Sequence, residues 1–182
     1  ERGYRGMIEG VAGVDVIFSI VSTGKDLHEV YFGAHGVAAG NGKVPGIFVD
    51  CSTIAVEESA DIRKRLKARG AEFVASPVSG NAKVIKAGKL TVVASGPKDA
   101  FDAVAPYLEA IGQGVSYVGD GELSRIAKIC HNVMLAVVTQ SMAEISVLAE
   151  KAGIPRHALL DFLNKSVMGS TFTRYKTPAF VN

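Results

Sequence analysis

Short apolar runs alternate with amphipathic stretches along the first two thirds of the chain. Almost continuously apolar segments predict buried strands at 15–21, 46–50, 72–75, 90–94 and 115–118. Between them, one apolar and one charged face predict helices at 25–31, 56–68 and 98–111. This alternation of strand and helix indicates an α/β layer built on a parallel sheet.

The pattern changes after Gly119. Between 122 and 151 the chain has neither glycine nor proline, and apolar residues cover far more than one stripe of a helix. This predicts one long buried helix of about 45 Å, which is too long to flank a compact sheet. A shorter helix is predicted at 156–164. We therefore place a domain boundary near Gly119, with an α/β part at 1–119 and a helical part at 120–182.

Composition and charge exclude several functional classes. The chain has 182 residues, 48% of them apolar, so it can bury a core and is not expected to be disordered. Twenty Lys and Arg residues against eighteen Asp and Glu residues leave a net charge of +2 without a charged tail, which does not support a nucleic-acid partner. The chain has no uninterrupted apolar run of about 18 residues, so the sequence predicts no membrane span. Cys51 and Cys130 lack metal-ligand spacing, so we expect no metal site and a reducing, cytoplasmic setting.

Loops rich in hydroxyl groups and glycine follow three of the predicted strands, at 21–24, 52–53 and 76–81. Open parallel sheets bind ligands outside the carboxyl ends of their strands, where the loops vary while the sheet stays rigid. Hydroxyls and exposed backbone N–H groups are suited to holding phosphate, amide or carboxylate groups. The same residue types also form ordinary turns, so each loop taken alone has two interpretations.

A lysine and an asparagine lie four residues apart, and hence on one face, in an apolar part of the predicted long helix. They are Lys128 and Asn132. A structural lysine here would extend its ammonium to solvent or pair with an acid such as Glu144. A functional one would exchange a proton with a bound polar ligand that the asparagine amide orients. Arg125 adds a second cation. His131 has no other ligand-type residue at a spacing suited to a metal ion, so it is interpreted as a structural or surface histidine.

Four segments resemble, in order and spacing, those of the β-hydroxyacid dehydrogenases. They are Asp50-Cys-Ser-Thr-Ile54, Ser76-Pro-Val-Ser-Gly80, Ala87-Gly-Lys-Leu-Thr91 and Lys128-Ile-Cys-His-Asn132-Val-Met-Leu. Members related to 3-hydroxyisobutyrate dehydrogenase look most similar. The resemblance covers essentially the whole chain.

The resemblance implies an incomplete Rossmann-type parallel sheet for NAD or NADP, a long interdomain helix, and the start of an all-helical domain that usually dimerises. The cleft between the two domains would hold a small carboxylate substrate, with Lys128 as the catalytic residue. The other residues that the resemblance assigns are Asn132 beside the substrate, Ser79, Gly80 and Asn81 at its carboxylate, Ile20, Val21 and Ser22 at the cofactor, and Thr53 near the nicotinamide.

The sequence departs from the usual family pattern at several positions. Asn81 replaces the second glycine of the carboxylate loop, Ala75 replaces an aspartate, and residues 20–22 read Ile-Val-Ser in place of Met-Leu-Pro. No buried strand precedes the glycines nearest the start, which are Gly3, Gly6 and Gly10. A second lysine, which the family places in the helical domain beyond the present end of the chain, is also absent. We therefore expect an internal piece of a larger enzyme, inactive by itself.

Residues and resemblance together predict an oxidoreductase that interconverts a small 3-hydroxy acid and its semialdehyde with NAD or NADP. One alternative is a reductase of tartronate or succinate semialdehyde. The other is a non-catalytic relative that keeps the fold for binding or assembly. The presence of Lys128 and Asn132 argues against the second alternative.

Overall fold

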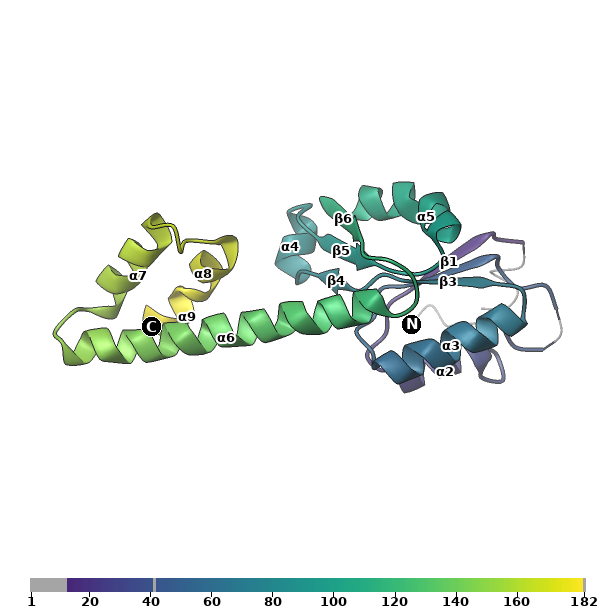
Figure 1. The fold of residues 1–182 in the computed structure, drawn as a ribbon, viewed down its shortest axis with the longest axis horizontal. Helices are drawn as coiled ribbons and strands as arrows, with labels where there is room; N and C mark the ends of the chain where they lie inside the picture. Colours follow the sequence, from purple (N-terminus) through teal and green to yellow (C-terminus); the bar gives the residue numbers. More distant parts are fainter. Residues whose placement is uncertain (1–12, 41, 182) are drawn as a thin grey trace. The chain divides into compact units, whose positions relative to one another are not determined.

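The structure is a computed structural model that describes residues 13–40 and 42–181 (Figure 1). The chain divides into two compact units, one ending at Lys128 and the other beginning at Ile129. The domain boundary near Gly119 stays a prediction. Outside the described residues lie the glycines considered for a dinucleotide turn, Gly3, Gly6 and Gly10.

The first unit contains a three-stranded parallel sheet in the order β1-β2-β3. Its strands are β1 (Val16–Ser19), β2 (Ile47–Asp50) and β3 (Glu72–Ala75), connected by helices α2 (Gly24–Phe32) and α3 (Val56–Ala68). Both helices cover the same face of this sheet (Figure 1). The arrangement confirms the predicted α/β class with a Rossmann-type parallel sheet, since parallel neighbours need such crossover helices.

A second sheet follows in the same unit, in the order β4-β5-β6. It consists of β4 (Val78–Ser79), β5 (Thr91–Ala94) and β6 (Gly114–Tyr117), with α4 (Ala82–Lys86) and α5 (Lys98–Ile111) between them. Strands β5 and β6 are parallel, but β4 pairs with β5 antiparallel. Neither β4 nor α4 was predicted, because elements of two and five residues are too short to show a hydrophobic period.

Apolar side chains from both faces of the first sheet form two cores. The core beneath α2 and α3 includes Leu27, Tyr31, Phe48, Ile62, Leu66 and Phe73. The core beneath α5 includes Val49, Val74, Val92, Val104 and Leu108. Neighbouring strand residues therefore enter opposite cores, which explains why the strands are apolar at consecutive positions rather than at alternate ones.

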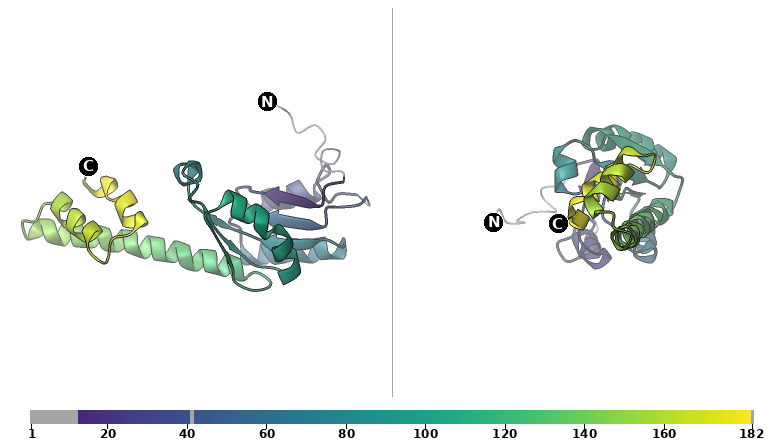
Figure 2. Two further views of the ribbon diagram at one scale, coloured as in Figure 1. Left: turned by 90° about the horizontal axis from the view of Figure 1, so that it is seen from above. Right: turned by 90° about the vertical axis from the view of Figure 1, so that its left-hand side faces the viewer.

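The helical part begins with α6 (Leu123–Lys151) and continues with α7 (Arg156–Lys165), α8 (Thr171–Lys176) and α9 (Pro178–Val181). Figures 1 and 2 show α7 to α9 beside the second half of α6. An ion pair between Arg156 Nε and Glu150 Oε1, 2.7 Å apart, joins α7 to the end of α6. The predicted long helix is thus confirmed.

The prediction that this helix is buried is wrong for the described part of the chain. Many of its apolar side chains are exposed, namely Ile126, Ile129, Val133, Met134, Val137, Val147 and Leu148. The reason is that α7, α8 and α9 have only ten, six and four residues and cannot cover every face of a helix of 29 residues. By length and composition alone, α6 could also cross a membrane, a property that core helices of globular proteins share.

Leu66→Ala should lower the free energy of unfolding by about 2–5 kcal/mol, because it empties a fully buried position between α3 and the sheet. Chemical denaturation followed by circular dichroism measures the change. The neighbouring exposed residue offers a control, since Lys67→Ala should alter the same free energy by less than about 0.5 kcal/mol. Equal losses in the two variants would contradict this description of the core.

Candidate active site

Two loops at the carboxyl edge of the first sheet are tied to each other. The backbone N–H of Val21 donates to Ser52 Oγ at 2.8 Å, which links the loop after β1 to the loop after β2. Ser52 Oγ in turn donates to Asp50 Oδ1 at 2.7 Å, and Ser19 Oγ donates to the same oxygen at 3.0 Å. One buried carboxylate therefore organises the ends of both strands.

Arg125, in the first turn of α6, pairs with this carboxylate. Its Nη2 lies 2.6 Å from Asp50 Oδ2, and the two side chains are only 1% and 0% exposed. Arg125 Nε donates to Ser59 Oγ on α3 at 3.1 Å, and its Nη1 donates to the carbonyl of Ser52. The guanidinium thus joins the start of α6 to β2, to the loop that follows β2, and to α3.

A second set of contacts secures the same helical turn. Arg63 Nε lies 2.6 Å from Glu122 Oε1, and Arg63 Nη2 donates to the carbonyl of Gly121 at 2.7 Å. Ser124 Oγ donates to the carbonyl of Ala75 at 2.9 Å. The start of a helix leaves backbone N–H groups without intrahelical partners, and the Ser124 N–H finds one by donating to Ser95 Oγ at 3.0 Å.

Lys128 follows Arg125 by three residues in α6 and is also buried, with only 9% of its surface exposed. It differs from Arg125 in its lack of a polar partner within the described residues. Among residues 13–40 and 42–181, no hydrogen bond or ion pair involves its ammonium group. Burial lowers the pKa of Lys128, because a poorly solvated site disfavours the charged form.

The alternative pairing of Lys128 with Glu144 is wrong. Both residues belong to α6, and sixteen positions along one α-helix place them about 24 Å apart. Glu144 Oε1 instead accepts a hydrogen bond from Gln140 Nε2 at 2.8 Å.

Asn132, the predicted partner of the lysine, stands one helical turn beyond it on α6 and is exposed. Its Oδ1 lies 3.2 Å from Nδ1 of the neighbouring His131. The roles assigned to Lys128 and Asn132 stay predictions.

The predicted carboxylate loop lies where β4 passes into α4. Ser79 ends β4, and Gly80 has a φ of 147°, which favours glycine. A Cβ added at Gly80 would lie 2.7 Å from Val84 Cγ1, so the loop also needs glycine for space. Asn81 Oδ1 accepts from the Val84 N–H at 3.1 Å and so begins α4. Asn81 therefore has the turn-forming role that was one of the two interpretations of this loop.

The residues assigned to the cofactor lie on the two tied loops. Ile20 is 67% exposed, Ser22 and Thr53 are exposed, and Val21 is half-buried. An exposed aliphatic side chain beside exposed hydroxyls, at the carboxyl edge of a parallel sheet, fits contact with a flat ring that carries an amide. These residues therefore fit the nicotinamide end of NAD or NADP.

Several residues around this centre were not predicted from the sequence. Asp50 and Ser59 belong to the buried network and were not predicted, whereas Ser52 lies in a loop that was predicted to bind a ligand and instead bonds to Asp50. Tyr31 donates to or accepts from Ser19 Oγ at 2.6 Å, and burial together with the Asp50 charge raises its pKa. The same two causes raise the pKa of Cys51 to about 12, so Cys51 is a thiol at neutral pH and not a nucleophile.

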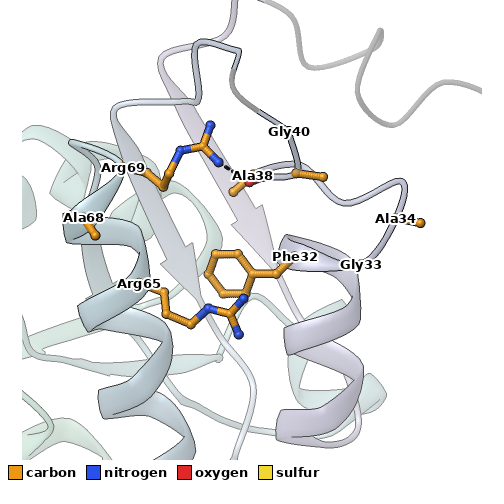
Figure 3. A pocket seen from close by; sticks show the side chains of 9 residues that line it. Phe32, Gly33, Ala34, Ala38, Gly40, Arg65, Ala68 and Arg69 are labelled. Carbon is orange, nitrogen blue, oxygen red and sulfur yellow. Dashed lines mark hydrogen bonds between the residues drawn. The ribbon is translucent and has the colours of Figure 1, made fainter.

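Two hollows on the described surface lie elsewhere. One, of about 540 Å³, lies between the end of α2 and the end of α3 (Figure 3). Arg65 stacks there on the Phe32 ring at 4.1 Å, and Arg69 Nη1 donates to the carbonyl of Ala38 at 2.6 Å. The other, of about 640 Å³, is lined by residues of α2 and α3. No predicted site residue lines either hollow.

Within the described residues, no group of His, Cys, Asp and Glu side chains could hold a metal ion.

Comparison with known proteins gives the same class that the fold and the site suggest. Residues 2–119 match the family described as "NAD binding domain of 6-phosphogluconate dehydrogenase". Residues 123–182 match "NAD-binding of NADP-dependent 3-hydroxyisobutyrate dehydrogenase". The chain therefore belongs to the β-hydroxyacid dehydrogenase family of NAD(P)-binding proteins and is 3-hydroxyisobutyrate dehydrogenase-like.

Individual relatives agree with this assignment. The chain is 30% identical over 173 residues to 3-hydroxyisobutyrate dehydrogenase of Pseudomonas aeruginosa, which covers 93% of this chain and 58% of that protein. It is 33% identical over 152 residues to the mitochondrial 3-hydroxyisobutyrate dehydrogenase of Mus musculus, covering 84% and 45%. The solved Mycobacterium tuberculosis 3-hydroxyisobutyrate dehydrogenase with L-serine has a TM-score of 0.82 at 27% identity, covering 96% and 59%. The chain thus spans about half the length of these relatives.

Lys128→Met should raise the midpoint of thermal unfolding at pH 7. A lysine with a lowered pKa binds its proton less tightly in the folded state than in the unfolded one. Stability from this group therefore rises with pH, from below the lowered pKa up to the ordinary value of about 10.4. The gain from the substitution should accordingly shrink as the pH approaches that value.

Thermal unfolding followed between pH 7 and 10.5 checks this expectation. Lys98→Met is the control, because Lys98 pairs with Asp102 on the exposed surface of α5. A midpoint that falls at pH 7 in the Lys128 variant would show that Lys128 gains more from a partner than it loses by burial.

Proposed function

We propose that the protein is an NAD(P)-dependent oxidoreductase that interconverts a small 3-hydroxy acid and its semialdehyde. The observation that carries the proposal is the buried ammonium group of Lys128, which has no hydrogen bond or ion pair among the described residues. A structural lysine at this depth would be expected to have a partner, because an unpaired buried charge is costly. A lysine that meets a ligand instead keeps its hydrogen-bonding capacity free.

Lys128 performs the proton transfer in this proposal. Its ammonium donates a proton to the carbonyl oxygen of the semialdehyde during reduction, and its neutral amine accepts the hydroxyl proton during oxidation. Burial lowers the pKa of Lys128, and a shift in this direction favours proton transfer because it brings the group closer to neutral pH. NAD or NADP, when bound, supplies or accepts the hydride.

The two remaining tasks fall to the loops. Ile20, Val21, Ser22 and Thr53 contact the nicotinamide end of the cofactor, and their mutual position is fixed by the hydrogen bond from the Val21 N–H to Ser52 Oγ. The loop from Ser79 to Asn81 receives the substrate carboxylate, for which Gly80 permits close approach of the backbone.

A reductase of tartronate or succinate semialdehyde is the rival activity. It would use the same proton donor and the same carboxylate loop, with a different fit around the rest of the substrate. Steady-state comparison of these semialdehydes with that of 3-hydroxyisobutyrate, by kcat/KM, separates the two proposals.

We also propose that the full-length protein is a homo-oligomer that acts in the cytoplasm. The support for the cytoplasm is that Cys51 and Cys130 are both free thiols, and the support for the oligomer is the exposed apolar surface of the helical unit, where Leu148 and Phe162 are 69% and 65% exposed. Apolar surface of this extent is typical of regions that pack against another chain. A second copy supplies an apolar surface of the same kind.

Lys128→Met should reduce turnover by roughly 10²-fold or more, since general acid–base catalysis typically contributes about 10² to 10⁴. Methionine is a good helix former that suits an apolar position, so the helix should persist. Lys151→Met, at the exposed end of the same helix, is the matched control and should leave kcat unchanged. A folded Lys128→Met enzyme that keeps more than about a tenth of its turnover would exclude the acid–base role of Lys128.

Ser79→Ala should raise the KM for the hydroxy acid several-fold while changing the KM for the cofactor little, because it removes one hydroxyl at the predicted carboxylate site. Steady-state kinetics with each substrate varied in turn measure the two constants. Ser116→Ala removes an exposed hydroxyl from β6 and serves as the control. If both constants rise equally, the loop has a task other than carboxylate binding.

A further inference from the structure

Three segments of the candidate site converge on the carboxylate of Asp50. Its Oδ1 accepts from Ser19 Oγ at 3.0 Å and from Ser52 Oγ at 2.7 Å, and its Oδ2 lies 2.6 Å from Arg125 Nη2. Each donor stands beside, or one helical turn from, a residue assigned to the site: Ser19 next to Ile20, Ser52 next to Thr53, and Arg125 before Lys128.

We propose that Asp50 and Arg125 are a positioning pair, which holds the Lys128 ammonium at a fixed place relative to the two loops assigned to the cofactor. The inference rests on the proposed function for the meaning of that placement. Neither member touches a ligand itself, since both side chains are buried to within 1%. They act through the backbone of α6 and through the two serines.

The guanidinium of arginine suits this task where the ammonium of lysine does not. Arg125 directs three N–H groups toward three different partners, namely Asp50, the Ser52 carbonyl and Ser59. Contacts in three directions fix both the rotation and the position of the first turn of α6. A lysine would keep the charge but lacks the planar fork that makes these contacts together.

The first turn of α6 retains other attachments when Arg125 is changed. Arg63 still pairs with Glu122, and Ser124 still donates to Ala75. A conservative change at Arg125 therefore loosens the placement of the helix without detaching it, which makes the proposal testable in a folded protein.

Arg125→Lys in the full chain is the first test. The expected result is at least a tenfold loss of kcat, measured at a temperature where the variant is fully folded. The pKa of Lys128, followed by NMR of ¹³C-labelled lysine side chains, should rise toward the ordinary value, because a loosened helix admits water to the ammonium group. This titration needs neither cofactor nor turnover.

A double variant guards against misfolding. Asp50→Asn with Arg125→Gln keeps a polar, uncharged side chain at both positions and leaves no unpaired buried charge, whereas either change alone would. We expect the double variant to be more stable than either single variant, yet to show the same loss of kcat and the same rise in the Lys128 pKa. Lys98→Met, which breaks an exposed ion pair on α5, is the control and should change neither quantity.

The outcomes separate this inference from the proposed function. If the Lys128 pKa stays where it is in both variants, and kcat falls only as far as the unfolded fraction explains, the pair is a structural tie and the inference is overturned. If the pKa moves but Lys128→Met keeps its turnover, the placement of Lys128 is confirmed and the proposed function fails.

Discussion

The rest of the first unit depends on one constraint, the buried carboxylate of Asp50 at the end of β2. Asp50 is fully buried, and a charge in that position must be neutralised and hydrogen-bonded or it destabilises the fold. Arg125 meets this demand from a different part of the chain, 75 residues away. The need to satisfy one charge thereby decides where the long helix begins and which elements it contacts.

Two cations in the same stretch of α6 have opposite surroundings. Arg125 has a partner for each of its nitrogen atoms, whereas the ammonium of Lys128 has none within the described residues. The difference separates a side chain that maintains the structure from one that is available for chemistry. A fully paired charge keeps its protonation state, while desolvation of an unpaired amine makes its ammonium form lose the proton more readily.

The helical unit obeys a different constraint. Only a few of its apolar side chains are buried, among them Met142, Ala149 and Leu160, and its helices after α6 are short. The apolar sequence of α6 is typical of a buried helix. Many of its apolar side chains are nevertheless exposed in the described chain. Apolar composition records that a surface is suited to burial, and only the packing partners decide whether burial occurs.

From the sequence alone, hydrophobic period and breakers determined the class of fold and most element bounds, with α3 at 56–68 and α5 at 98–111 found as predicted. The resemblance likewise identified the family from short segments such as 76–80. The tertiary structure alone decided that Lys128 is buried, that Asn81 begins α4, and that β4 pairs with β5 antiparallel. Local patterns report propensity and periodicity, whereas pairing between Asp50 and Arg125 depends on chain segments that meet only when the fold is complete.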